Sequence, residues 1–202
     1  MSRTLFTSRA GGDLKLPANR QTLGQAISLT TLHFMRQTHS DLVMVVDEKG
    51  ENFECDALVT STPGVGIAAL AADCMPITFS AESVVGVAHI GRVGLGSAIA
   101  IKTVRAMREL GAQEIVATIG PSICRDCYEV SSDMYREFIL HTPASSTSQA
   151  QHSLDLQRGV RAQLEANSVT VINLNLCTLE NPLYFSFRRG GESARQAGII
   201  SL

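Results

Sequence analysis

Short apolar segments, separated by polar and glycine-containing stretches, dominate the first half of the chain. Runs of this length that are rich in Val, Ile, Leu and Ala are typical of buried strands. We therefore expect strands at 32–36, 42–46, 57–60, 66–72, 75–79 and 84–88. Similar segments later in the chain predict strands at 114–119, 169–174, 183–187 and 197–200.

Helical periodicity appears in the second half of the chain. Apolar residues recur every three or four positions over 97–110 and over 153–167, which places them on one helical face. Ser97 is suited to cap the first of these helices. A shorter helix is expected at 131–140, and the Pro-, Ser- and Thr-rich stretch 141–152 is expected to form an exposed loop. Strands and helices together predict an α/β fold.

Composition favours a single domain spanning residues 1–202, because a chain with 45% hydrophobic residues can bury a full core. The net charge is −2 and Lys and Arg are dispersed, so we expect a small-molecule ligand and no nucleic acid or membrane partner. No secretory signal is recognisable, and the longest apolar stretch, 66–79, is too short to span a bilayer. We expect a cytoplasmic protein; its oligomeric state is left open.

Three metal-competent side chains lie at the ends of predicted strands. Cys74, in the segment AADCMPIT, and His39 each follow a strand, and His89 ends one. Strand ends can converge on one edge of a sheet, and one thiolate with two imidazoles suits zinc. The residues alone leave a second interpretation open, in which Cys74 packs in the core as a small apolar side chain.

Several short motifs occur in a characteristic order from Phe6 to the C-terminus: QTHS, DALVT, ADCMP, GVAHIG, IGPSI, CYEV, LDL, CT, FSFRR and RQAG. In this order they resemble the landmarks of the YfiH-like laccase-domain family. The resemblance implies a single domain with a layered α/β/β/α core. It also implies a zinc ion held by His39, Cys74 and His89, which would form the catalytic centre.

Proteins of this family have been described as polyphenol oxidases or laccases, as purine nucleoside phosphorylases that also deaminate adenosine and cleave methylthioadenosine, and as peptidoglycan-editing hydrolases. A laccase needs several copper centres, and a chain with five His residues lacks the ligands for them. Zinc lowers the pKa of a bound water to about 7, which suits deamination. We therefore expect a zinc-dependent purine nucleoside phosphorylase with adenosine deaminase activity, with copper the less expected metal.

Two other functions stay open. In the first, His89 activates Cys74 as the nucleophile of a hydrolase that edits peptidoglycan precursors. In the second, the chain is a non-catalytic protein that keeps the metal for structural reasons.

Four arginines are candidates for binding the phosphate or ribose of a nucleoside substrate: Arg9, Arg92, Arg188 and Arg189. The family motif H-A-G-W-R-G is replaced here by a sequence with Arg92 at the tryptophan position and Val93 at the arginine position. We expect this change to weaken phosphate capture, so that adenosine yields inosine faster than adenine. For Arg9, Arg188 and Arg189 the alternative interpretation is that each lies at a strand end and faces the solvent.

Cys124 and Cys127 form a C-x-x-C motif. A zinc ribbon would need a second pair of cysteines, which the sequence lacks, so we interpret Cys127 as a packing residue beneath the CYEV motif.

Overall fold

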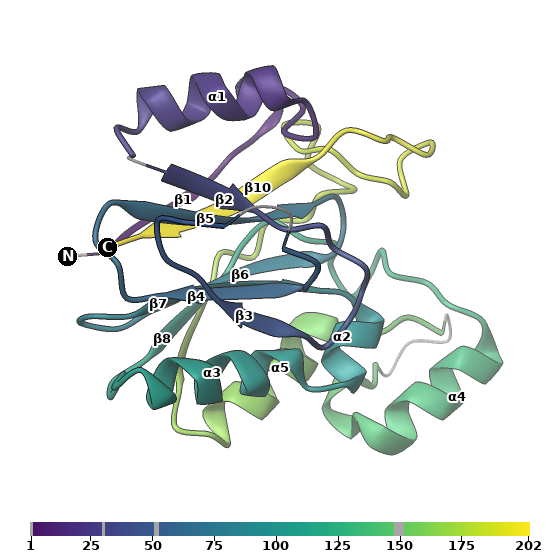
Figure 1. Cartoon of the computed structure of the whole chain (residues 1–202). Coiled ribbons are helices and arrows are strands. Elements are labelled where there is room, and N and C mark those ends of the chain that lie inside the picture. Colours follow the sequence, from purple (N-terminus) through teal and green to yellow (C-terminus); the bar gives the residue numbers. More distant parts are fainter. Residues whose placement is uncertain (1, 30, 51–52, 148–151) are drawn as a thin grey trace.

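The computed structural model describes residues 2–29, 31–50, 53–147 and 152–202. Within this part of the chain, two β-sheets lie one above the other between helices (Figure 1). The first sheet has the strand order β1-β10-β5-β2, and the second has the order β3-β4-β7-β6-β8-β9.

The strands of the first sheet are β1 (Arg3–Phe6), β2 (Thr31–Phe34), β5 (Val65–Ala71) and β10 (Gln196–Ser201). Those of the second are β3 (Val43–Val45), β4 (Ala57–Thr60), β6 (Met75–Ser80), β7 (Val85–Ile90), β8 (Val116–Ile119) and β9 (Thr170–Asn173). The helices are α1 (Pro17–Ala26), α2 (Arg92–Gly96), α3 (Ile99–Glu109), α4 (Ser132–His141) and α5 (Leu156–Glu165).

Helix α1 covers the outer face of the first sheet, and α3 and α5 cover the outer face of the second (Figure 1). The layers therefore follow the order α/β/β/α, and the expected fold class is confirmed. None of the helices in the described part of the chain is long and apolar enough to cross a membrane.

Successive side chains of β5 point to opposite faces of the first sheet, and each face packs against a different hydrophobic core. Ala68 packs with Leu14 on the side of α1, whereas Ile67 and Ala69 pack with Leu58 of the second sheet. Successive residues of a strand point to opposite faces, so a strand that is apolar throughout is stable only when both faces are covered. The sequence of β5 is apolar throughout because α1 covers one face of this sheet and the second sheet covers the other.

The chain crosses between the two sheets at several points on one side of the molecule. After β2 of the first sheet it passes to β3 of the second, and after β5 it passes directly to β6. Both crossings, together with the end of β7, lie on the right-hand side of Figure 1. Polar residues at these places are therefore brought to one edge of the sandwich.

Two expected features differ from the structure. The helix expected at 97–110 is confirmed as α3, but it is preceded by Ala98 and not capped by Ser97; Ala98 adopts a left-handed conformation with φ 58° and separates α3 from the short helix α2, which the sequence pattern did not predict. The strand expected at 183–187 is wrong: both backbone polar groups of Phe185 are hydrogen-bonded by the Gln196 side chain, at 2.7 and 3.1 Å, in place of a strand partner.

The sequence pattern also missed β1 and α1, which carry few apolar residues. Of the expected loop at 141–152, Pro143–Ser145 forms a short 3₁₀ helix, and residues 148–151 lie outside the described residues. Helix α5 begins at Leu156, since the Asp155 carboxylate accepts a hydrogen bond from the Arg158 amide and caps it.

Candidate functional site

Three side chains from distant segments meet at the edge where the chain crosses between the sheets. His39 lies on the crossing after β2, Cys74 on the crossing between β5 and β6, and His89 in β7. One ring nitrogen of each histidine and the Cys74 Sγ all lie within 4.8 Å of one another. The two imidazole rings are 4.9 Å apart and nearly perpendicular, at 77°.

The backbone beside this group is in an uncommon conformation. His39 has φ 59° and Asp73 has φ 85°, and non-glycine residues adopt such values at a cost in free energy. The Gln37 amide holds the first turn in place, because it donates to the Leu70 carbonyl and accepts from the Leu70 amide, both at 2.8 Å. The turn that carries His39 is thereby fixed to the edge of β5.

A single buried carboxylate organises both histidines. Asp56 Oδ1 lies 2.8 Å from His89 Nδ1. Asp56 Oδ2 accepts hydrogen bonds from the backbone amides of Thr38 and Ser40, at 3.1 and 2.6 Å, and from the Ser40 hydroxyl at 2.8 Å. One oxygen therefore orients the His89 ring while the other fixes the turn that carries His39.

Hydrogen bonds outweigh burial in setting the charges of this group. Burial raises the pKa of Asp56, but the bonds from His89 and Ser40 lower it to about 2. Burial lowers the pKa of His89, but Asp56 and Cys74 raise it to about 9. Burial raises the pKa of Cys74, but His39 and His89 lower it to about 6. At neutral pH the metal-free group thus contains a thiolate beside an imidazolium.

The donor set fits a zinc ion. Zinc binds Cys sulfur and His nitrogen, and a site with three protein ligands keeps one position open. Asp56 occupies Nδ1 of His89, which leaves Nε2 for a metal, and a carboxylate on the second nitrogen is the usual support of a metal-bound histidine. Gly91 leaves room for the sulfur, because a Cβ at this position would lie 2.8 Å from Cys74 Sγ.

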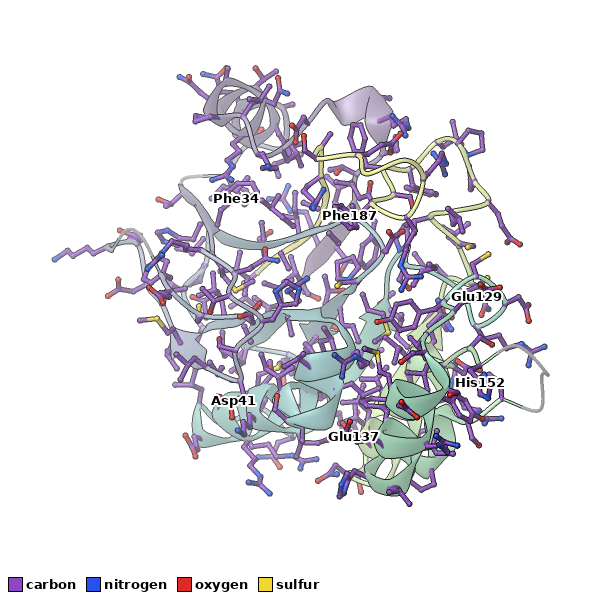
Figure 2. The ribbon with its side chains drawn as sticks, turned by 90° about the vertical axis from the view of Figure 1, so that its right-hand side faces the viewer. Phe34, Asp41, Glu129, Glu137, His152 and Phe187 are labelled. Atoms are coloured by element: carbon purple, nitrogen blue, oxygen red, sulfur yellow. The ribbon has the colours of Figure 1, made fainter. Side chains whose placement is uncertain are left out.

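The group lies in a cleft of about 520 Å³, a volume within the usual range for small-molecule sites. Figure 2 faces this side of the molecule, with Phe187 of the cleft labelled. Three large apolar side chains and three cationic side chains line it together with the metal-competent group: Met35, Leu70 and Phe187, and Lys15, Arg188 and Arg195. The cleft therefore offers apolar surface beside positive charge.

Tyr128 lies in the same cleft and connects the cationic and metal-competent parts. The Arg188 guanidinium lies 4.9 Å from the centre of the Tyr128 ring and donates to the Glu129 carbonyl at 3.0 Å. Burial and the Cys74 sulfur raise the pKa of Tyr128, whereas Arg92 and Arg188 act in the opposite direction. The Tyr128 hydroxyl therefore keeps its proton at neutral pH and can donate a hydrogen bond.

Asp73 holds the loops around the cleft. Its Oδ1 accepts from the Thr178 hydroxyl at 2.7 Å and its Oδ2 accepts from the Arg188 amide at 2.8 Å. Its backbone carbonyl accepts from the Ile123 amide at 2.9 Å. The connection between β9 and β10 and the loop after β8 are thus both anchored to the residue that precedes Cys74.

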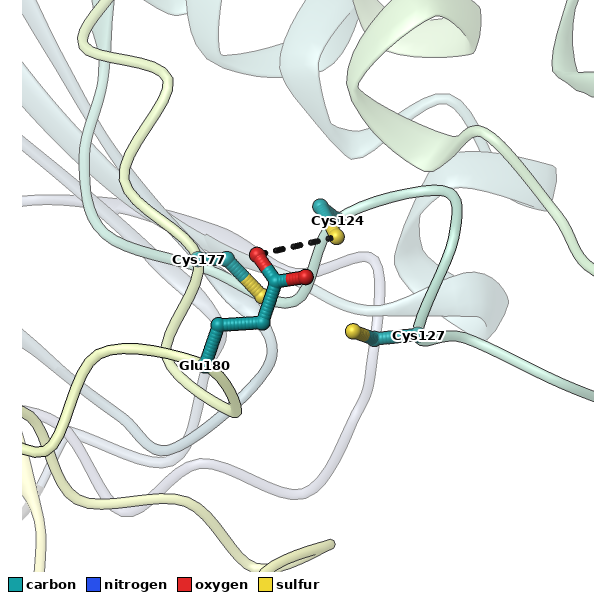
Figure 3. A group of neighbouring side chains, drawn as sticks. All are labelled: Cys124, Cys127, Cys177 and Glu180. Atoms are coloured by element: carbon teal, nitrogen blue, oxygen red, sulfur yellow. Dashed lines mark hydrogen bonds between the residues drawn. The ribbon is translucent and has the colours of Figure 1, made fainter.

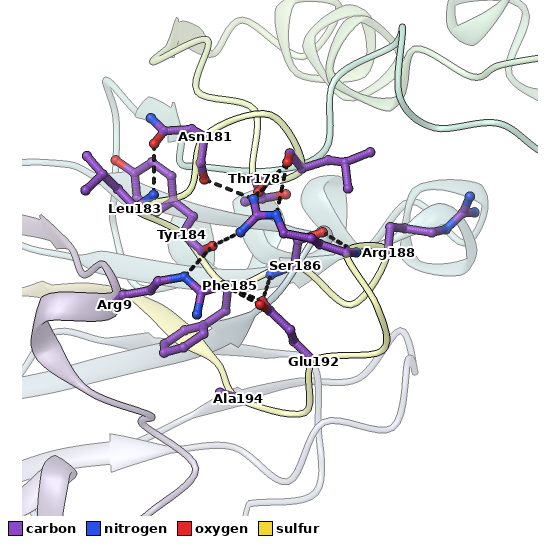
Figure 4. A network of polar contacts seen from close by, with 12 residues as sticks. Arg9, Thr178, Asn181, Leu183, Tyr184, Phe185, Ser186, Arg188, Glu192 and Ala194 are labelled. Atoms are coloured by element: carbon purple, nitrogen blue, oxygen red, sulfur yellow. Dashed lines mark hydrogen bonds and ion pairs between the residues drawn. The ribbon is translucent and has the colours of Figure 1, made fainter.

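Of the four candidate arginines, Arg188 lines the cleft and Arg92 approaches Tyr128. Arg9 and Arg189 are not among its lining residues, and their guanidinium groups bind elsewhere. Figure 4 shows Arg9 beside Glu192. Arg9 pairs with the Glu192 carboxylate, with Nη2 2.5 Å from Oε1.

Arg189 donates to the backbone carbonyls of Thr178, Leu179, Asn181 and Tyr184. These contacts fold the C-terminal loop on itself. Val93, expected to weaken phosphate capture, is 48% exposed and does not line the cleft.

Four residues of this site were not predicted from the sequence: Asp56, Tyr128, Lys15 and Arg195. Three of them stand in the recognised motifs, since Asp56 begins DALVT, Tyr128 belongs to CYEV and Arg195 begins RQAG. Their presence in these motifs was the available signal. Lys15 lies in no motif, and only the fold brings it to the cleft.

The remaining histidines are not members of the metal-competent groups found among the described residues. His33 Nε2 bonds to the Asp47 carbonyl at 2.8 Å, and the His152 ring contacts that of Tyr135. His141 is the last residue of α4. Within the described residues, the metal-competent groups thus contain two histidines, both in the cleft.

Known proteins resemble the chain over nearly its whole length. A Corynebacterium glutamicum protein named purine nucleoside phosphorylase is 34% identical over 231 aligned residues, which cover 99% of this chain and 94% of the relative. A Streptomyces griseus protein with the same name is 38% identical over 198 residues, covering 92% of this chain and 80% of the relative.

Solved structures agree with these sequence relatives. A Neisseria meningitidis protein of family DUF152 matches with a TM-score of 0.88 and 30% identity, covering 100% of this chain and 94% of the other. Bacillus licheniformis YfiH matches with a TM-score of 0.88 and 26% identity, covering 100% and 92%. The family model described as multi-copper polyphenol oxidoreductase laccase matches residues 8–202. The chain therefore belongs to this YfiH-like laccase-domain family.

Proposed function

We propose that the protein is a zinc-dependent purine nucleoside phosphorylase that also deaminates adenosine. The observation that carries the proposal is the His39, Cys74 and His89 group in a cleft of about 520 Å³ that combines apolar and cationic walls. The two relatives named purine nucleoside phosphorylase, each of which aligns with more than nine-tenths of this chain, support the same reaction.

His39, Cys74 and His89 would hold the metal, with Asp56 fixing the tautomer of His89 through its Nδ1 proton. A bound zinc ion supplies Lewis acidity, which polarises a substrate oxygen or activates water without a redox step. Copper is the weaker candidate, because the donor group contains three ligands and the remaining histidines of the described residues lie elsewhere.

The cleft walls suit the parts of a nucleoside. Phe187, which is 57% exposed, offers an aromatic face to a purine, and Met35 and Leu70 supply further apolar surface. Arg188, Arg195 and Lys15 provide the positive charge that phosphate requires. We assign phosphate binding to these cations, with the guanidinium of Arg188 held in position by the ring of Tyr128.

In phosphorolysis, a phosphate oxygen forms a bond to C1′ of the ribose while the bond from C1′ to the purine nitrogen breaks. The products are ribose 1-phosphate and a free base, which leaves with a proton. Tyr128 keeps its proton at neutral pH and is our candidate for the hydrogen bond to the departing base or to phosphate. Adenosine, inosine and methylthioadenosine are the proposed substrates.

Deamination of adenosine consumes water and releases ammonia, so it needs no phosphate. The two reactions are therefore separated by incubating adenosine with and without phosphate and identifying the products. The proposal predicts adenine that depends on phosphate and inosine that does not. Zinc-loaded protein that forms neither product from adenosine, inosine or methylthioadenosine would contradict the proposal and favour a non-catalytic metal-binding role.

Neighbouring arginines provide a matched test of phosphate binding. We expect Arg188→Ala to raise the KM for phosphate about tenfold while thermal stability stays close to that of the parent protein. Arg189→Ala should instead lower stability, because it removes hydrogen bonds that fold the C-terminal loop. Equal effects of both changes on the KM for phosphate would contradict this assignment.

The balance between the two activities tests the loop after His89. The expectation that Val93 weakens phosphate capture predicts that inosine forms faster than adenine and that Val93→Arg raises adenine release. The matched change is Arg92→Ala. Loss of phosphate-dependent adenine release in this variant would mean that Arg92, beside Tyr128, has taken over the role of the missing arginine.

A cysteine hydrolase acting on peptidoglycan precursors is a second candidate, and one observation favours it. Cys74, His89 and Asp56 are arranged as nucleophile, base and orienting carboxylate, and the pKa of Cys74 is lowered to about 6. Metal removal separates the candidates: a phosphorylase that uses zinc loses activity with a chelator, whereas a cysteine nucleophile keeps it and is inactivated by iodoacetamide.

A further inference from the structure

A second group of metal-competent side chains lies on the loops beside the cleft. Cys124, Cys127, Cys177 and Glu180 point toward one another (Figure 3), and their sulfur and carboxylate oxygen atoms all lie within 4.8 Å of one another. All three cysteines are free thiols, and none of the four residues lines the cleft. The group therefore requires its own explanation.

The backbone brings these side chains together through two defined contacts. The amides of Cys127 and Tyr128 both donate to the Cys124 carbonyl, at 3.1 and 3.0 Å, which closes a tight turn around the C-x-x-C motif. Cys177 is brought beside this turn because it pairs with Ser122 in an isolated β-bridge. The hydrogen bonds of the fold thus hold both loops in place around the group.

Packing does not account for the arrangement. Cys124 and Cys127 are only partly buried, and Glu180 is exposed, yet its Oε2 approaches the Cys124 Sγ to 4.0 Å. The Cys124 thiol donates a long, weak hydrogen bond to this carboxylate, which does not explain why Cys127 and Cys177 lie beside it as well, whereas thiolates and a carboxylate are all zinc ligands. Zinc–sulfur bonds of about 2.3 Å place the corners of a tetrahedron about 3.8 Å apart, so small side-chain rotations close this group around an ion.

We propose that Cys124, Cys127, Cys177 and Glu180 form a second, structural zinc site. Its four protein ligands leave no position for a substrate, as in other structural zinc sites. Soft thiolate ligands favour zinc or Cu(I) over magnesium and calcium. The carboxylate ligand favours zinc over Cu(I). This site does not depend on the function proposed above.

The position of the site indicates what it stabilises. Tyr128, which lines the cleft, directly follows Cys127, and Thr178, which bonds to Asp73, directly follows Cys177. A zinc ion would therefore link the loop that positions Tyr128 to the loop that anchors the residue before Cys74. Its loss should loosen both loops.

The test measures zinc in protein purified without added metal, by elemental analysis after gel filtration. Cys74→Ser serves as the background, since it removes the sulfur ligand of the cleft group. We expect about two zinc ions per chain in the parent protein, about one in Cys74→Ser, and less than about 0.2 in Cys74→Ser/Cys177→Ser. The matched control is Cys74→Ser/Cys55→Ala, which changes a buried cysteine outside both groups and should keep about one.

Cobalt substitution gives a spectroscopic signal that appears only if the thiols bind a metal ion. Loops that fold without a metal would not produce it. The sulfur-to-cobalt charge-transfer band of Cys74→Ser should indicate three thiolate ligands, and it should weaken by about a third in Cys74→Ser/Cys124→Ser. If the double variant does not fold, the band of Cys74→Ser alone still tests the site.

Cys74→Ser protein without zinc and without this band would overturn the proposal. A Cys124–Cys127 disulfide in protein purified under nitrogen would overturn it as well, because it would assign the motif to redox chemistry. A copper ion in place of zinc would contradict the stated metal. None of these outcomes bears on phosphorolysis, which is measured separately.

Discussion

The two metal-competent groups of this protein contain the same residue type in opposite chemical states. In the cleft group, one cysteine lies between two histidines, and hydrogen bonds from His39 and His89 lower the pKa of Cys74 to about 6 despite burial. In the loop group, burial and the Cys177 thiol raise the pKa of both Cys124 and Cys127. Neighbours therefore decide whether a cysteine is a thiolate or a thiol when no metal is present.

The groups differ equally in what surrounds them. The cleft group draws on three separate segments and opens onto apolar and cationic walls, and Asp56 orients its histidines. The loop group joins two loops, and none of its four residues lines the cleft. A mixed donor set with an open side suits chemistry, whereas a closed thiol-rich set suits a structural ion. We therefore expect the two groups to respond differently to the same kind of change.

The largest expected difference concerns activity. Cys74→Ser should lower kcat/KM for phosphorolysis by a factor on the order of 10³, because it removes a ligand of the proposed catalytic metal. Cys177→Ser should change kcat/KM by less than about tenfold in assays well below the melting temperature, since it acts only through the loops. Steady-state rates with inosine and phosphate measure both effects. Comparable losses of kcat/KM in both variants would contradict the assignment of the cleft group to catalysis and of the loop group to structure.

A smaller difference is expected in zinc affinity, because Asp56 holds a ligand of the cleft group and no ligand of the loop group. Asp56→Asn keeps the size of the side chain but weakens the acceptor of the His89 Nδ1 proton. We expect zinc affinity at the cleft site to fall about 10- to 100-fold and that of the loop site to stay unchanged. Competition with a fluorescent chelator measures both affinities. Unchanged affinity at the cleft site would mean that Asp56 supports only the turn at Thr38 and Ser40.

The smallest effect is on thiol reactivity in metal-free protein. The lowered pKa of Cys74 predicts that its alkylation by iodoacetamide speeds up as the pH rises through about 6 and then levels off. The raised pKa values of Cys124 and Cys127 predict that their alkylation still accelerates above pH about 9. Mass spectrometry of digested protein follows each cysteine separately. A shared pH profile for the three thiols would contradict the opposite shifts.

The layered fold and the positions of His39 and Cys74 at strand ends could be predicted from the sequence, because both follow from local hydrophobic patterns and short motifs. The apolar runs that end before His39 and Cys74 marked the edge of the sandwich, and the ordered motifs indicated the layered fold. Hydrophobic periodicity reports which residues face a core, and strand ends follow from it directly.

Features that depend on contacts between distant segments could not be predicted in this way. Asp56 and His89 are 33 positions apart, and nothing local relates them until β4 pairs with β7. The C-x-x-C motif lacked a partner in the sequence because Cys177 reaches it only through the bridge with Ser122. The start of α3 after Ala98 could not be predicted either, because helical periodicity does not report the left-handed conformation of that residue.

Zinc titration of metal-free protein tests the central claim most directly. The Cys177→Ser variant, in which the loop site is disabled, is stripped with a chelator and titrated with zinc while the phosphate-dependent release of hypoxanthine from inosine is followed. The account predicts no release before zinc is added and a linear rise that stops at about one zinc ion per chain. Full release of hypoxanthine by the stripped protein, with no response to zinc, would contradict it.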